Sequence, residues 1–201
     1  RSRGLGDVYK RQVVVASVIV IHGDDHGMVL PPSVAPIEVV VVPIPYKGRE
    51  DVVEEARKVG RELKESGFSV VVDDREDVTP GSKFYEWELA GVPVRLEVGP
   101  RDLEEGTVTL VERDTLERRR APLDGLIQEV AAAMDRVADR LRRRAWDWLR
   151  SNVRAASSLG EARAALEEGG GVVEVPWCGE AECGLAMEGE ANAQALGEPV
   201  D

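Results

Sequence analysis

Cysteine, histidine and long apolar runs are scarce in this chain of 201 residues, and each scarcity narrows what the protein can be. Two cysteines, no apolar segment near 18 residues and no secretory signal predict a soluble, cytoplasmic protein that does not contact a membrane. The sequence also lacks a glycine-rich phosphate loop, a nucleophile elbow and a histidine base with an orienting carboxylate. We therefore predict no catalytic residue in this chain.

Positive charge is also in deficit, because 26 lysines and arginines face 38 acidic residues for a net charge of -12. This balance argues against a general nucleic-acid binder, which needs cations for phosphate contacts. The charge is uneven, however: residues 101–154 carry 12 arginines against 11 acids, and residues 155–201 carry one arginine against 10 acids. The middle of the chain is therefore free to meet RNA. The arginine runs 118–120 and 142–144 could contact phosphates, or could be a solvated helix or loop face.

The hydrophobic pattern predicts an α/β fold. Buried strands are expected at 37–44, 68–72, 92–98 and 107–111, and helices at 49–66, around 83–88 and from about 123 onward. This order predicts a three-layer domain of about one hundred residues with a mixed β-sheet and flanking helices. A short helix near 161–166 and a strand at 172–175 predict a partial small α+β domain after it, with a poorly packed acidic end at 188–201.

The densest chemistry lies in one short stretch, TPGSKFYEWELAGVPVRLEVGPRDL, from Thr79 to Leu103. Valine and leucine alternate with Arg95 and Glu97, so these two side chains are expected to share the open face of a strand. Lys83, Phe84 and Glu88 precede it on a short helix ended by a glycine. The alternative is a solvated strand with a weak surface ion pair between Arg95 and Glu97.

This stretch resembles the anticodon-binding domain of prolyl-tRNA synthetases of the archaeal and eukaryotic-like type, whose pattern is close to TPGxKFxEWExxGVPxRxExGPxDL. The earlier segment HGDDHGMVLPP, from His22 to Pro32, resembles the family's HGDDxGLVLPP, where the class II catalytic domain ends. The resemblance implies an end of the catalytic domain and linker at 13–35, an anticodon-binding domain at 36–145 and a partial zinc-binding-like domain at 146–201. Residues 1–12 do not fit, and we interpret them as a cloning or assembly artefact.

The resemblance also implies function: the parent ligase would attach L-proline to tRNA(Pro) using ATP with Mg²⁺, and would be a homodimer. Proline codons begin with two cytosines, so the matching anticodons carry two guanines. Glu88 and Glu97 would accept hydrogen bonds from guanine edges, and Arg95 and Arg101 would donate to bases or phosphates. Phe84 would stack on the anticodon, and Lys83 is a weaker phosphate candidate.

The sequence departs from the family in two places. An arginine that contacts ATP is expected near position 13, where this chain has Val13. Cys178 and Cys183 resemble half of a four-cysteine site for a structural Zn²⁺, and the chain has no further cysteine pair.

Two other functions stay open at this point. The chain could be a non-catalytic RNA-binding or protein-docking module with the same fold. It could also bind a small molecule through Asp73 and Asp74, which follow a predicted strand.

Overall fold

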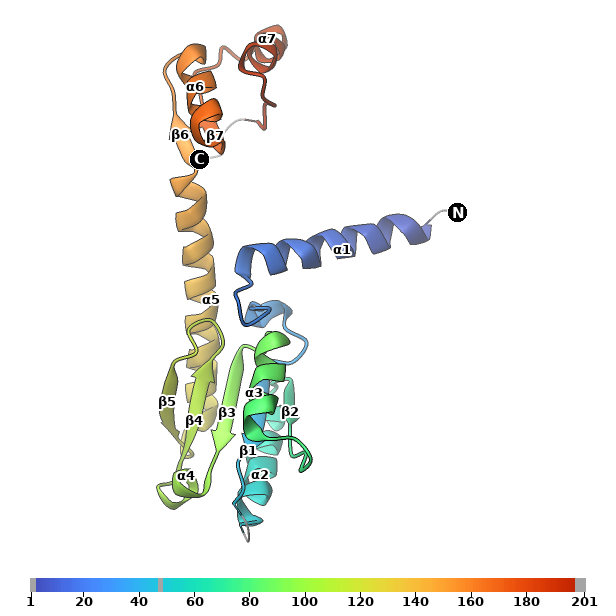
Figure 1. Cartoon of the computed structure of the whole chain (residues 1–201), viewed down its shortest axis with the longest axis vertical. Helices are drawn as coiled ribbons and strands as arrows, with labels where there is room; N and C mark the ends of the chain where they lie inside the picture. Colours follow the sequence, from blue (N-terminus) through green and yellow to red (C-terminus); the bar gives the residue numbers. More distant parts are fainter. Residues whose placement is uncertain (1–2, 47–48, 198–201) are drawn as a thin grey trace. The chain divides into compact units, whose positions relative to one another are not determined.

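The computed structural model describes residues 3–46 and 49–197, which form two compact units, 1–142 and 143–201 (Figure 1). The first unit contains a five-stranded mixed sheet with the strand order β2-β1-β3-β4-β5. Strands β1 (Val39–Pro43), β2 (Val70–Val72) and β3 (Val94–Val98) are parallel, whereas β4 (Thr107–Glu112) and β5 (Arg118–Pro122) are antiparallel to their neighbours.

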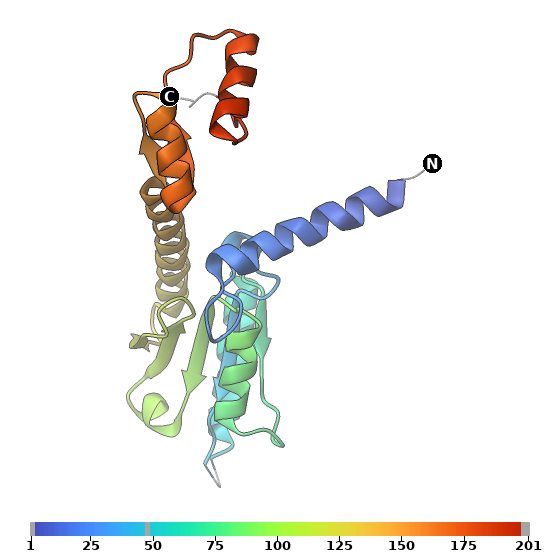
Figure 2. The same ribbon diagram turned by 45° about the horizontal axis from the view of Figure 1, so that its top comes forward.

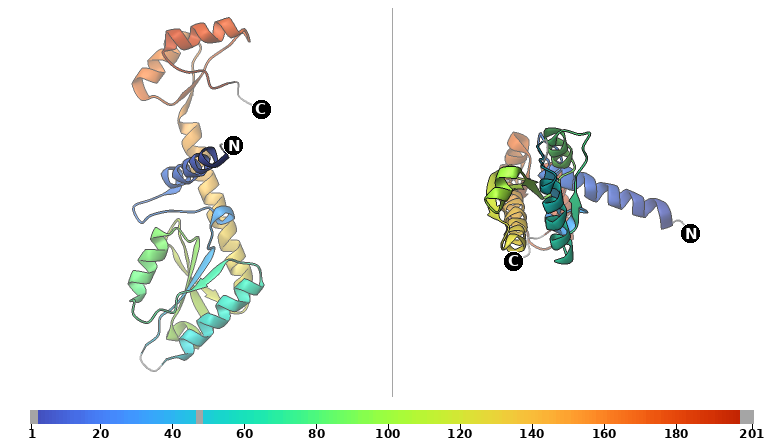
Figure 3. Two further views of the ribbon diagram at one scale, coloured as in Figure 1. Left: turned by 90° about the vertical axis from the view of Figure 1, so that its right-hand side faces the viewer. Right: turned by 90° about the horizontal axis from the view of Figure 1, so that it is seen from below.

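Two helices cover one face of this sheet, α2 (Asp51–Glu65) and the first part of α5 (Leu126–Ser151). The view along the sheet in Figure 3 shows both on the same side. On each helix, apolar side chains three and four residues apart pack against alternate residues of the strands. The main hydrophobic core therefore lies between these two helices and the sheet. Its members include Val39, Val41, Leu96, Leu110, Ala56, Leu63, Val130 and Met134.

The opposite face carries helix α3 (Pro80–Leu89), which packs on β1 and lies over it in Figure 2. A smaller core of Val40, Val42 and Val92 packs there against Phe84 and Trp87. Among the described residues, no helix covers β4 and β5 on this side of the sheet (Figure 3). The α3 face is therefore half covered and half open.

A helix and a connector precede the sheet. Helix α1 (Arg3–His22) includes much of the segment that we expected to stand outside the fold. The connector after it packs Val29 against Val137 and Leu141 of α5. Within the described ranges, no helix has both the length and the apolar content needed to cross a bilayer.

The second unit has its own small sheet, in which β6 (Val153–Ala155) runs parallel to β7 (Val172–Glu174). Helix α6 (Leu159–Gly169) connects them, and α7 (Ala181–Ala191) follows. Ser158 caps α6 by accepting a hydrogen bond from the Glu161 amide.

The predicted fold class is confirmed, since a mixed sheet lies between helices on both faces. Of the two alternatives for the first arginine run, the solvated helix or loop face is excluded, because Arg118, Arg119 and Arg120 begin the edge strand β5. The short helix α4 (Pro100–Glu104) and strand β6 were not predicted. Helix α7 occupies part of the end that we expected to be poorly packed, and residues 198–201 lie outside the described ranges.

Candidate nucleic-acid interface

Helix α3 places the aromatic and acidic side chains of the site. Its first turn is fixed by Pro80 and by the Thr79 hydroxyl, which accepts a hydrogen bond from the Ser82 amide at 3.3 Å. Phe84 and Glu88 are four residues apart, so both point from the same face of the helix toward the sheet. A tight turn at Gly91, with φ of 76°, then leads into β3.

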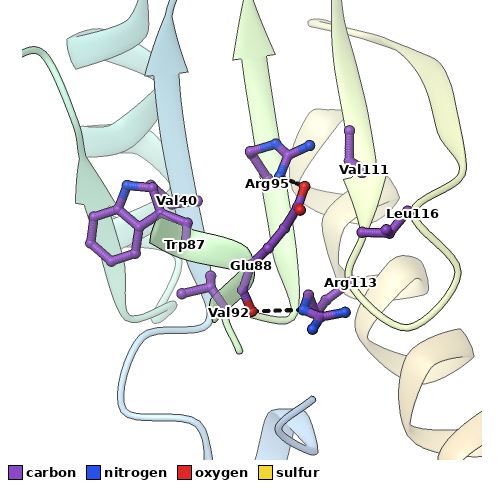
Figure 4. A pocket seen from close by; sticks show the side chains of 8 residues that line it. All are labelled: Val40, Trp87, Glu88, Val92, Arg95, Val111, Arg113 and Leu116. Carbon is purple, nitrogen blue, oxygen red and sulfur yellow. Dashed lines mark hydrogen bonds and ion pairs between the residues drawn. The ribbon is translucent and has the colours of Figure 1, made fainter. Parts of the chain in front are cut away.

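Arg95 on β3 is the centre of the site. Its Nε donates to Glu97 at 3.1 Å and its Nη1 donates to Glu88 at 2.7 Å. The guanidinium lies over the Phe84 ring, 4.3 Å from the ring centre, in cation–π geometry. Phe84 and Glu88 of α3 and Glu97 of β3 thus all contact Arg95. Figure 4 shows Arg95 facing Glu88.

Glu97 is the most buried charge of the group, with 1% of its side chain exposed. A carboxylate so far from water needs strong partners. One oxygen accepts from Arg95, and the other accepts from Arg118 on β5, whose side chain is 59% exposed. A completely buried acid is therefore in contact with a largely solvated cation at the open half of the sheet.

A small pocket lies beside this network and is lined by side chains from α3, β1, β3, β4 and the turn after β4 (Figure 4). Its lining residues are Val40, Trp87, Glu88, Val92, Arg95, Val111, Arg113 and Leu116. Arg113 closes one side by donating from Nε to the Glu88 carbonyl at 2.9 Å. His26 of the connector is 3.7 Å from the Glu88 carboxylate. Backbone and side chain of Glu88 are thus both held in place.

The structure corrects one expectation about these residues and places two further ones. Arg95 and Glu97 do share a face, but that face is not open, because Phe84 and Glu88 of α3 lie against it and leave Arg95 only 8% exposed. Lys83 is 3% exposed and donates to the Asp73 carbonyl at 3.0 Å, so its ammonium group is held inside the fold. Arg101 is exposed on α4, beyond the far end of β3 from Glu88.

Asp73 is a structural residue in this fold. Arg75 donates to its carboxylate twice at 2.8 Å, and the Trp87 indole donates at 2.8 Å. The hydrogen bonds from Arg75 lower the pKa of Asp73 from 3.8 to about 2, against the opposing effect of burial. Asp74 is in turn paired with Arg57 at 2.6 Å. Asp73 is therefore committed to contacts within the fold, whereas Asp74 is 35% exposed in a surface ion pair.

Sequence reasoning assigned Arg118 only a possible phosphate contact and assigned Arg113 nothing. Charge runs identify cations but not their partners, and the acids that these arginines meet are distant in sequence, at Glu97 and Asp24. The sequence did contain a signal for the contact of Arg118, because Glu97 alternates with apolar residues and is therefore expected on a buried strand. A carboxylate on a buried strand requires a cation from a neighbouring strand.

The two cysteines do not complete a metal site. Cys178 is exposed and Cys183 is partly buried, and both are free thiols. Hydrogen bonding from the Glu180 backbone, and then from the Cys183 thiol, lowers the pKa of Cys178. In the part of the chain that the structure describes, no group of three or more histidine, cysteine or acidic side chains is placed to hold a metal ion. The four ligands of a structural Zn²⁺ are therefore not assembled here.

Comparison with known proteins bears directly on this interface. Residues 38–133 match the family model of the anticodon binding domain, HGTP_anticodon. The chain is 50% identical over 187 residues to a proline–tRNA ligase of Thermococcus kodakarensis, which covers 92% of the chain and 39% of that protein. It is 48% identical over 190 residues to a proline–tRNA ligase of Metallosphaera sedula, and this match covers 93% of the chain and 40% of that protein. The chain spans about two fifths of the length of these relatives.

Proposed function

Because residues 38–133 belong to the anticodon binding domain family, we propose that this chain reads the anticodon of tRNA(Pro) as part of a proline–tRNA ligase. The ligase would join L-proline to the tRNA in two ATP-dependent steps, as a cytoplasmic homodimer. We assign no residue of this chain to ATP, Mg²⁺ or proline. The contribution of the chain is recognition of RNA.

The observation that carries this proposal is the convergence of Phe84, Glu88, Arg95 and Glu97 at the border between the covered and open halves of the sheet. Carboxylate oxygens accept from the N1 and N2 protons of guanine, and a guanidinium donates to its O6 and N7. An aromatic ring provides the stacking surface that an unstacked base requires. The set of groups therefore matches both the paired N1 and N2 donors and the O6 and N7 acceptors of guanine.

The open half of the sheet gives the RNA backbone a place to lie. Arg120 is 59% exposed there, on the edge strand. Cations next to a base-reading site favour phosphate without adding specificity. The net charge of -12 then limits nonspecific RNA binding, because most of the protein surface repels phosphate.

Binding of purified tRNAs at a stated salt concentration tests the proposal. We expect tRNA(Pro) to bind at least tenfold more tightly than a tRNA without guanines at the same anticodon positions, the effect of about one lost base contact. Glu88→Gln keeps the shape of the side chain and removes its charge, so it should weaken tRNA(Pro) binding by about 1–3 kcal/mol.

Glu86→Gln is the matched control, because Glu86 lies on the same helix, is 51% exposed and pairs with Arg75 away from the site. It should bind like the unmodified protein. Equal affinity for proline and non-proline tRNAs would refute the proposed function.

A further inference from the structure

The ion pair between Arg118 and Glu97 joins a cation at the surface to an acid in the interior. Resting on the function proposed above, we propose that Arg118 occupies in the RNA-free protein the position on Glu97 that a guanine takes when the anticodon binds. Arg118 is then an internal competitor of the base, which sets the affinity and sharpens the choice of guanine.

The chemistry of the two donors is similar. A guanidinium presents parallel N–H groups in a plane, and the Watson–Crick edge of guanine presents N1–H and N2–H in a similar arrangement. Glu97 accepts from the buried Arg95 through one oxygen and from Arg118 through the other. The Arg118 side of Glu97 faces the open half of the sheet. A base that approaches over β4 would meet this second oxygen.

Arg118 is the partner that can leave. Its side chain is 59% exposed, whereas that of Arg95 is 9% exposed and is held by Phe84 and Glu88 as well. The exposed Arg118 side chain regains water when it leaves, so separation costs Arg118 little and the cost falls on the buried Glu97. Glu97 is only 1% exposed, so water cannot replace Arg118 and another hydrogen-bond donor must take its place.

The displaced cation also enforces selectivity. With Arg118 away, a base that cannot donate two hydrogen bonds leaves the buried carboxylate underpaired, which costs more than the lost contact alone. Adenine and the pyrimidines lack the paired donors of guanine. For these bases the original ion pair is the better state.

Arg120 is a control within the same strand. It faces the same side of β5, two residues from Arg118, and is equally exposed at 59%. Its partner is Glu105, which is itself 51% exposed and not part of the site. The two arginines therefore differ in the acid that they hold.

The test measures binding of a two-guanine anticodon stem-loop, and of the same loop with both guanines changed to adenine, at high salt to screen phosphate contacts. Arg118→Ala should bind the guanine loop about three- to fivefold more tightly than the unmodified protein, because the competitor is gone. Arg118→Lys, which keeps charge without the planar fork, should fall between the two. Arg120→Ala should show no gain.

Three outcomes are informative. If Arg118→Ala loses affinity and salt dependence to the same extent as Arg120→Ala, Arg118 is a phosphate contact and the inference is overturned. Unchanged affinity for Arg118→Ala also overturns it. If the unmodified protein does not prefer the guanine loop, the proposed function itself fails, which the first two outcomes leave intact.

Discussion

Arg113 holds Asp24 through two guanidinium–carboxylate hydrogen bonds of 2.7 Å, although 89 residues separate them in the chain. The third bond of the same guanidinium reaches the Glu88 carbonyl. Backbone hydrogen bonds from Met28 to Leu89 and from Leu30 to Gly91 continue the contact. The connector at 23–30 is thereby fastened to the end of α3, directly beside the candidate interface.

Arg113→Ala should loosen the connector. The arginine side chain is 2% exposed, and its loss removes three charge-assisted hydrogen bonds, while Asp24 remains about one third exposed and can be hydrated. We expect a loss of about 1–3 kcal/mol in the free energy of unfolding, measured by urea denaturation. Arg142→Ala is the control, because Arg142 and its partner Asp139 are both more than 60% exposed. A loss below 0.5 kcal/mol, about the effect of an ordinary surface substitution, would contradict this role for Arg113.

Stability should fall in acid through Asp73 and Asp24. Hydrogen bonds from Arg75 and Arg113 respectively lower the two folded-state pKa values from 3.8 to about 2. Because the folded pKa is depressed, the stabilisation is complete above pH 5 and is lost as pH falls from about 4 toward 2. Asp73 should account for about 2 kcal/mol of it and the more exposed Asp24 for about 1 kcal/mol.

Urea denaturation at pH 6, 4 and 3 measures this dependence. Asp73→Asn should be less stable at pH 6 and should lose less stability on acidification than the unmodified protein. An identical pH dependence in the two proteins would show that Asp73 retains an ordinary pKa in the fold.

Gly91→Ala should be strongly destabilising. The residue has φ of 76°, and a Cβ there would lie 2.8 Å from both the Cβ and the carbonyl oxygen of Met28. The strain and overlap should cost about 2–4 kcal/mol. Gly81→Ala on α3 meets nothing within 4 Å and should instead gain up to about 1 kcal/mol. The melting temperatures of both variants, measured by thermal unfolding, test this prediction. Equal shifts in melting temperature would contradict the close approach of Gly91 to Met28.

Phe84→Leu should separate RNA binding from folding. Leucine retains apolar contact with Val40 and Val42 but has no π face for Arg95 or for a base. We expect anticodon stem-loop binding to weaken by about 1–3 kcal/mol and folding by no more than about 1 kcal/mol. Tyr85→Leu is the control, because Tyr85 is 60% exposed elsewhere on α3. If both variants bind RNA equally well, Phe84 is not a stacking surface.

Strands β1 and β2 could be predicted because they are purely apolar. The continuous valines of β1 indicate a buried strand, and the spacing of Val52, Ala56 and Val59 on α2 indicates a helix. Strand β5 was missed for the opposite reason: its buried side is represented by Ala121, and three arginines obscure the pattern.

The sequence predicted which residues form the candidate site, but it did not predict how far their side chains are buried. Alternation shows that Arg95 and Glu97 share a face, yet it does not show what covers that face. The covering depends on α3, whose direction is set by tertiary contacts such as Lys83 to the Asp73 carbonyl. Such contacts join residues that local periodicity treats independently.

The central claim is that this interface reads two guanines, and single substitution of each guanine by inosine tests it most directly. Inosine lacks the N2 amino group and keeps the rest of the base, so shape and stacking are unchanged. Isothermal titration of the stem-loops should show about a 10- to 100-fold loss of affinity for at least one of the two positions, because a buried carboxylate is left with one donor in place of two. Equal affinity of all three stem-loops would contradict the account.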